Sequence, residues 1–155
     1  MTTSQRRLPL LNLLIAILCA VTVLCQFLPF WENEGATCSL QRMIWFPNDQ
    51  GSMPNYISDA TGEKFEIDSV VWLTLLTFIC SVLGGIFALV KRGAFFPSVF
   101  SLIGGIGAAI NYLTRPALQI GNLWGLHLTA GFLLLALGVY GVILLIFHIR
   151  EEKRA

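Results

Sequence analysis

Residues 69–114 read SVVWLTLLTFICSVLGGIFALVKRGAFFPSVFSLIGGIGAAINYLT, and their long apolar runs indicate the fold class. Two runs within it, Ser69–Val90 and Gly93–Thr114, contain no Asp, Glu, Lys or Arg and are separated only by Lys91 and Arg92. A helix needs about 20 mainly apolar residues to cross the roughly 30 Å hydrocarbon core of a bilayer. Because lipid offers backbone groups no outside partner, both runs are predicted to be transmembrane helices, joined as an antiparallel hairpin.

Two further charge-free runs flank this pair. They are Leu8–Trp31 and Pro116–Ile149, and the helical core of the second is predicted at Leu123–Phe147. We therefore expect an all-α membrane protein, a four-transmembrane-helix bundle in which the whole chain, 1–155, forms one integral membrane domain. The predicted spans are 8–31, 69–90, 94–114 and 123–147, and the predicted outer loop is 32–68.

The composition agrees with a polytopic membrane protein. Of the 155 residues, 55% are hydrophobic and only 12% are charged, whereas soluble domains average about 25% charged residues. This balance excludes a soluble enzyme, a nucleic-acid-binding protein with a basic face and a disordered chain. The lipid bilayer is therefore an expected partner, and nucleic acid is not.

The placement of Lys and Arg predicts the orientation, because cytoplasmic loops are enriched in both. Seven of the ten basic residues fall on one side of the four runs: Arg6, Arg7, Lys91, Arg92, Arg150, Lys153 and Arg154. That side is expected to be the cytoplasm, with both termini inside a plasma or inner membrane. The segment Glu32–Asp68 is then outside, with seven acidic residues against Arg42 and Lys64, a net charge of −5. Four aromatic residues are expected in the outer headgroup layer: Trp31, Trp72, Tyr112 and Trp124.

The outer segment contains enough apolar residues for a small folded cap. Charged and apolar residues alternate over Lys64–Asp68, the period of a half-buried strand, and a Thr-Gly turn signal precedes them. The pattern predicts a short β-hairpin over Tyr56–Ile67, and Leu40–Phe46 is a second candidate strand. Cys38 is the only cysteine of this segment, so it is free or pairs with Cys25 or another chain. The segment is either a structural cap or a recognition surface.

Small residues recur at helical spacing within the predicted spans. Such residues let membrane helices approach closely, so we expect them to pack the bundle, with a homodimer face as the alternative. The candidates are Ser81, Gly85, Ser101, Gly105, Ala109, Gly121 and Gly125. The pairs Gly84–Gly85 and Gly104–Gly105 lie at comparable distances from the Lys91–Arg92 link and are likewise expected to pack the bundle.

Four polar residues lie at similar depth, roughly 5–8 Å below the outer boundary at 1.5 Å per residue. They are Gln26, Thr74, Asn111 and His127. We expect an interhelical hydrogen-bond layer in which His127 faces the bundle interior, and a small ligand site is the alternative. The predicted spans contain no charged residue, which argues against ion-coupled transport and carboxylate catalysis. No metal-ligand or cofactor motif is recognised, so no cofactor is expected.

The exit from the first run, Leu28-Pro29-Phe30-Trp31, and the large first outer segment resemble the claudin-like tetraspan architecture. The outer segment lacks the paired cysteines and the Gly-Leu-Trp context of that family. The resemblance therefore implies a topology and no function.

These observations favour a protein that is not an enzyme. We expect a structural or accessory subunit that binds a membrane-protein partner, or a second copy, through its outer loop or a helix face. The alternative is an oligomeric component of a small transporter or channel, because four helices without charged residues make a poor pore alone.

Overall fold

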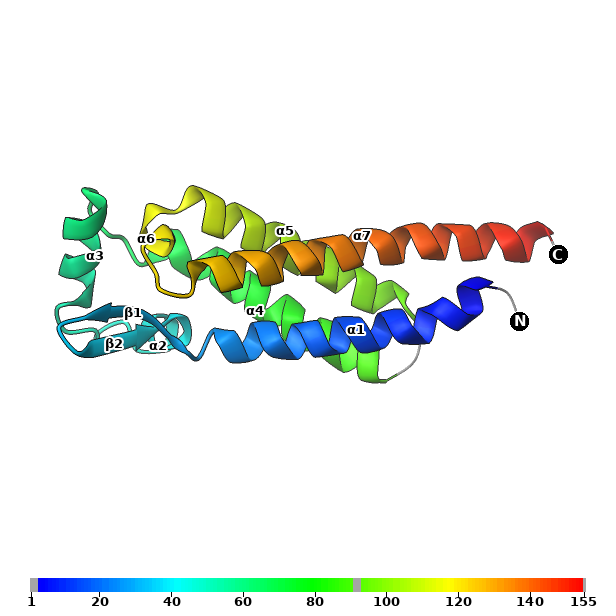
Figure 1. The fold of residues 1–155 in the computed structure, drawn as a ribbon, viewed down its shortest axis with the longest axis horizontal. Helices are drawn as coiled ribbons and strands as arrows, with labels where there is room; N and C mark the ends of the chain where they lie inside the picture. The colour runs from blue at the N-terminus through cyan, green and yellow to red at the C-terminus, as the bar shows by residue number, and fades with distance from the viewer. Residues whose placement is uncertain (1–2, 91–92, 155) are drawn as a thin grey trace.

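The computed structural model describes residues 3–90 and 93–154 and is mostly helical (Figure 1). Four long helices are long and apolar enough to cross a membrane. They are α1 (Thr3–Cys25), α4 (Asp68–Leu89), α5 (Phe95–Thr114) and α7 (Trp124–Arg154). Lys91 and Arg92, the predicted link between the second and third spans, lie outside the described residues.

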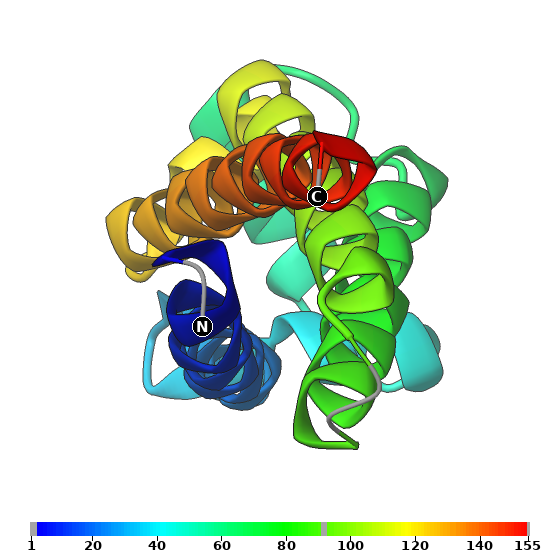
Figure 2. The same ribbon diagram turned by 90° about the vertical axis from the view of Figure 1, so that its right-hand side faces the viewer.

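The four helices run side by side, and the small elements gather at one end (Figure 1). We call this the cap end, and the opposite end, near both chain termini, the terminal end. α1 packs on α4 and α7, and α5 packs on the same two helices from the other side (Figure 2). The bundle is therefore a ring of four in which α1 and α5 are mainly opposite one another.

The first helix ends earlier than the predicted span. α1 ends at Cys25, and the next residues form tight turns in which Phe27 N donates to Leu24 O and Leu28 N to Cys25 O. Pro29 disfavours a helical conformation at Leu28 and begins strand β1 (Pro29–Asn33). The predicted boundary at Trp31 was wrong because the chain turns after Cys25, and Phe30 and Trp31 belong to the core of the cap.

The cap, residues 29–67, contains the only sheet in the described ranges. Strands β1 and β2 (Ala36–Ser39) pair antiparallel around Glu34 and Gly35, whose φ values are 51° and 83°. Positive φ at both central residues is the geometry of a two-residue hairpin turn. A hairpin therefore exists, but it lies earlier in the chain than the predicted Tyr56–Ile67.

Both segments predicted as strands contain helices. Leu40–Trp45 is α2, which begins where the side chain of Ser39 accepts a hydrogen bond from Arg42 N. Met53–Thr61 is α3, which has a proline in its first turn and ends at Gly62 with φ of 72°. These are ordinary start and stop signals of helices, and they prevail over the alternation that follows.

The alternation over residues 64–68 has a different cause. This stretch is irregular chain up to Asp68, where α4 begins. Phe65 and Ile67 pack against the cap core, while Lys64 and Glu66 are exposed. The chain therefore alternates between core and solvent without a neighbouring strand.

The last helix is longer than the predicted span. A short helix, α6 (Pro116–Gln119), precedes it, and α7 continues past Phe147 into the charged tail as far as Arg154. Its 31 residues rise about 46 Å, more than the roughly 30 Å of a bilayer core. Its last turns carry charged residues. They therefore suit a position beyond an apolar layer of that thickness.

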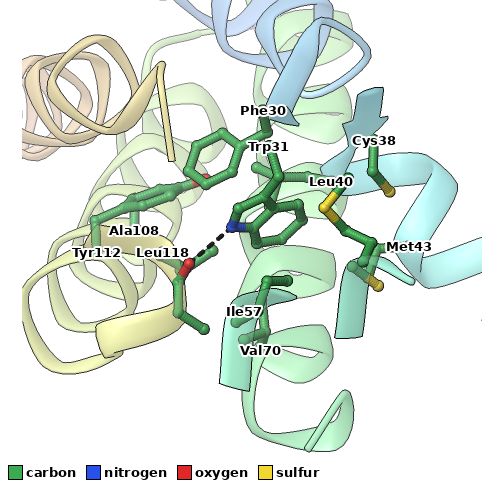
Figure 3. Packing of buried hydrophobic residues seen from close by; sticks show 12 residues of the cluster. Phe30, Trp31, Cys38, Leu40, Met43, Ile57, Val70, Ala108, Tyr112 and Leu118 are labelled. Carbon is green, nitrogen blue, oxygen red and sulfur yellow. Dashed lines mark hydrogen bonds between the residues drawn. The ribbon is translucent and has the colours of Figure 1, made fainter. Parts of the chain in front are cut away.

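An apolar cluster joins the cap to the bundle (Figure 3). Trp31 is 1% exposed and its indole N–H donates to Ala117 O at 2.8 Å. The ring of Phe30 lies edge-to-face on Trp31 and close to Tyr112 of α5. The expectation of Trp31 and Tyr112 in a headgroup layer was wrong, because both rings are buried in this cluster, whereas Trp72 on α4 is 71% exposed.

Candidate functional site

The four residues of the predicted polar layer are all buried toward the cap end. Gln26, Thr74 and Asn111 are at most 1% exposed and His127 is 3% exposed. They do not form one network. Each instead bonds with a nearby partner, so the layer consists of three separate groups.

The first group joins α4 to α5. Asn111 Nδ2 donates to Thr74 Oγ1 at 2.9 Å, and Thr74 Oγ1 donates to Val70 O at 2.8 Å. The Asn111–Thr74 hydrogen bond is buried, so it contributes more to helix association than an exposed one would. The Thr74–Val70 hydrogen bond lies within α4 and holds the Thr74 hydroxyl in place. This contact fits a structural role.

The second group joins α5 to α7. Tyr112 Oη lies 3.2 Å from His127 Nδ1, and the Phe30 ring stands edge-to-face to the imidazole with centroids 5.2 Å apart. Trp124 Nε1 donates to Tyr112 O at 2.7 Å. His127 therefore bonds with Tyr112 and not, as expected, with Gln26, Thr74 or Asn111. The contacts found for His127 among the described residues are aromatic rings and the Tyr112 hydroxyl, with no carboxylate among them.

The third group connects α1 to α2. Trp45 Nε1 donates to Gln41 Oε1, and Gln41 Nε2 donates to Gln26 Oε1, each at 2.6 Å. Gln41 is 2% exposed, so its amide is a buried bridge. The sequence analysis missed Gln41, Trp45 and Tyr112 as members of the polar layer. If residues 40–45 had been predicted as a helix, Gln41 and Trp45 would have been expected one turn apart on the same face.

The predicted packing residues act mainly between α5 and α7. Ser101 Oγ donates to Leu134 O at 2.7 Å. A Cβ at Gly105 would lie 2.6 Å from Leu135 Cα, closer than real contacts allow. Ala109 and Ser81 are also buried. The α5–α7 contact therefore needs a small residue at position 105.

The glycine pairs of α4 and α5 do not meet. A Cβ at Gly84 would lie 3.3 Å from Phe100 Cβ of α5 and 3.4 Å from Cys19 Sγ of α1. Gly85 also faces Cys19, whereas Gly104 faces Cys80 of α4. A Cβ at Gly121 would overlap the Phe30 ring, whereas one at Gly125 would meet no described atom within 4 Å. The two positions therefore do not form one packing face.

Further glycines on α7 have a packing role that the sequence analysis did not assign. A Cβ at Gly131 would lie 2.7 Å from Ala108 Cβ, and one at Gly138 would lie 2.6 Å from Leu102 Cα. Gly141 similarly faces Ser98. Their spacing of seven and then three residues is a helical stripe, the signal that could have revealed this face.

The described residues offer no obvious centre for metal or thiol chemistry. No cluster of three or more His, Cys, Asp or Glu side chains that could hold a metal occurs among them. The four cysteines are free and buried. Burial raises the pKa of the Cys38 thiol, and the nearby Arg42 guanidinium lowers it by less. Cys38 is therefore mostly a protonated thiol at neutral pH.

Two hollows stand out on the surface of the described chain. The larger, about 460 Å³, lies at the terminal end between α1, α4 and the start of α5, where Asn12 Nδ2 donates to Gly93 O at 3.2 Å. The other, about 370 Å³, lies at the cap end beside α2. The first is almost wholly apolar, whereas the second combines aromatic and charged walls.

No protein-family model, curated protein or solved structure matches this chain. Its function is therefore argued from the geometry above.

Proposed function

We propose that this chain is a four-span integral membrane protein of a plasma or inner membrane, with its cap outside and both termini in the cytoplasm. Its four long apolar helices support the embedding. The basic residues Arg7, Arg150, Lys153 and Arg154 lie toward the terminal end, and residues 32–68 of the cap end carry a net charge of −5. This charge distribution favours the stated orientation.

Within that membrane we propose the role of a non-enzymatic accessory subunit that binds a protein partner through its cap. One observation carries this proposal: all seven carboxylates of residues 32–68 are exposed. Six of them lie on the cap, which Trp31 and Phe30 fix to the bundle, and Asp68 begins α4 next to it. Together they form a preorganised acidic surface. Such a surface suits a partner with a basic face, because complementary charge directs association.

The buried polar groups support the same role. Gln26, Asn111 and His127 each bond with another side chain, and no carboxylate stands among these partners. General acid–base catalysis needs a titratable group within reach of substrate. The arrangement suits a stable scaffold better than a reaction centre.

Purification in mild detergent from the native membrane tests this proposal. A photo-crosslinking residue at Asn55, exposed on α3, should capture one protein other than this chain in stoichiometric amount. The triple variant Asp59→Asn, Glu63→Gln and Glu66→Gln should lose that capture. The matched control, Glu151→Gln with Glu152→Gln at the terminal end, should retain it.

A different pattern of crosslinks would contradict the accessory role. If crosslinks form only between copies of this chain, and arise from span positions such as Leu13 rather than from Asn55, the accessory role is wrong. A symmetric homo-oligomer with a continuous water path would instead support the transporter or channel alternative.

A further inference from the structure

The hollow beside α2 combines aromatic and charged side chains at the boundary between bundle and cap. It is lined by Phe27, Gln41, Arg42, Trp45, Phe46 and Asp49, with a volume of about 370 Å³. Ligand pockets typically have volumes of roughly 300–1,000 Å³. Phe27 follows the end of α1 by two residues and packs edge-to-face on Phe78 of α4. The hollow thus lies where the first two long helices meet the cap.

Its apolar wall is unusually exposed. Phe27, Trp45 and Phe46 are 56%, 59% and 62% exposed. The indole N–H of Trp45 bonds inward to Gln41, so the ring is held in place and needs no water for its polar group. Tryptophan is enriched at the lipid–water boundary, so an exposed Trp45 beside two apolar rings suits that level. Trp72, 71% exposed near the cap end of α4, extends the same pattern.

Its charged wall contains one cation and one anion. Arg42 Nη2 lies 3.3 Å from Asp49 Oδ2, and both side chains are at least half exposed. The turn that carries Asp49 is fixed, because Asp49 N donates to Phe46 O and Gln50 Nε2 donates to Arg42 O. An exposed ion pair contributes little stability, so each member can exchange its partner for a ligand group at low cost. A guanidinium binds phosphate through paired hydrogen bonds, and a carboxylate binds an ammonium.

We propose that this hollow binds the zwitterionic phosphodiester headgroup of an outer-leaflet phospholipid. Arg42 binds the phosphate, Asp49 binds the ammonium group, and the rings of Trp45 and Phe46 contact the glycerol and first methylene groups. The inference rests on the proposed membrane embedding, which brings the headgroup layer to this level.

The charges favour a zwitterionic headgroup over two other occupants. An anionic headgroup would bring net negative charge toward Asp49 and toward a segment with a net charge of −5. A basic peptide would place its charge against Arg42 and leave the aromatic wall exposed. Phosphatidylethanolamine and phosphatidylcholine share the required chemistry, and only the first can donate hydrogen bonds from its ammonium group to Asp49.

Lipid retention tests the proposal. The full chain is reconstituted into vesicles of equimolar phosphatidylethanolamine, phosphatidylcholine and phosphatidylglycerol, extracted in mild detergent, and its retained lipid is measured by mass spectrometry. We expect about one zwitterionic lipid per chain, enriched at least about five-fold over phosphatidylglycerol. A larger enrichment of phosphatidylethanolamine identifies the ammonium hydrogen bonds as the source of selection. Equal enrichment of both zwitterionic lipids identifies the shared dipole.

Charge variants localise the effect. Arg42→Gln should lose the retained lipid, Arg42→Lys should retain part of it, and Asp49→Asn should retain phospholipid without preferring zwitterions. The control Lys64→Gln, which removes an exposed cap charge outside the hollow, should behave as the unmodified chain. Equal retention of phosphatidylglycerol by the unmodified chain, or unchanged retention by Arg42→Gln, would overturn the proposal.

Carbonate extraction of the same vesicles separates this outcome from failure of the proposed embedding. A chain that remains in the bilayer but shows no zwitterion preference refutes only the headgroup site. A chain released by carbonate refutes the embedding itself, and the headgroup site with it.

Discussion

Individual polar side chains in this protein find partners that only folding brings together. Gln26, in the turn after α1, bonds with Gln41 on α2. Tyr112 and His127 are on the two helices that pack most closely. Each residue is buried in apolar surroundings where an unpaired amide or imidazole would cost free energy. Their side chains therefore help to set how the helices and the cap are rotated against one another.

The Tyr112–His127 contact yields a prediction about stability. His127→Leu should lower the free energy of unfolding by about 1–2 kcal/mol, because it leaves the buried Tyr112 hydroxyl without its partner. His127→Gln should cost less, since an amide can still bond with that hydroxyl. Thermal unfolding in mild detergent measures both effects. Thr129→Val, at an exposed position on the same helix, is the control.

A ligand role for His127 would give a different result. Both substitutions at position 127 would then abolish function while unfolding changed by no more than it does in the Thr129→Val control.

At the scale of elements, glycine positions decide which helices pack most closely. Gly105 on α5 faces the backbone of α7 at Leu135, and Gly131 and Gly138 on α7 face α5 in return. Small residues on both helices allow this close approach, where dispersion contacts stabilise membrane helices. A glycine with open space beside it, such as Gly125, has no such role.

The crowded surroundings of Gly105 and the open space beside Gly125 predict opposite effects of replacing each glycine with alanine. Gly105→Ala should destabilise the bundle by about 1–3 kcal/mol, because the added methyl group overlaps Leu135 and must displace α7. Gly125→Ala should stabilise it by about 0.5–1 kcal/mol, because alanine favours a helix and meets no described atom there. Unfolding temperatures of the two variants and the unmodified chain provide the measurement. Equal unfolding temperatures for Gly105→Ala and the unmodified chain would contradict the packing observed here.

At the scale of the whole molecule, polar and charged residues are concentrated at the two ends. The cap end carries seven exposed carboxylates, and the terminal end carries the basic tail of α7. The surface between the ends is rich in exposed leucine, isoleucine and phenylalanine. This surface would be costly in water and is suited to lipid.

The proposed orientation predicts the result of labelling in whole cells. In single-cysteine variants with the native cysteines replaced, a membrane-impermeant maleimide should modify Ser52→Cys in the cap and not Ser4→Cys near the N-terminus. Restoring Cys38 should add little labelling, because it is buried and its raised pKa keeps it protonated at neutral pH. That background should increase as the pH rises. Modification at position 4 in intact cells would contradict the orientation.

The number and approximate position of the four long helices could be read from the amino-acid sequence alone. Hydropathy and length are properties of one continuous segment, so they can be read without knowing which other segments pack against it. The same reasoning extended the first helix to Trp31. The hydropathy value of an apolar residue is the same whether lipid or a folded cap surrounds it. The glycine and proline signals of α3 were also available in the sequence, although the alternation after them was given more weight.

Which surfaces of the helices and the cap meet became apparent only in the folded chain. The indole of Trp31 bonds with Ala117, a residue 86 positions away, and Gly121 is small because the Phe30 ring occupies the adjacent space. Likewise, Gln41 becomes a buried bridge only when α2 folds beside the end of α1. Such contacts depend on how each helix is rotated and on where the cap docks. Both are set by packing the whole chain at once, because no local pattern encodes the distance between residues on different elements.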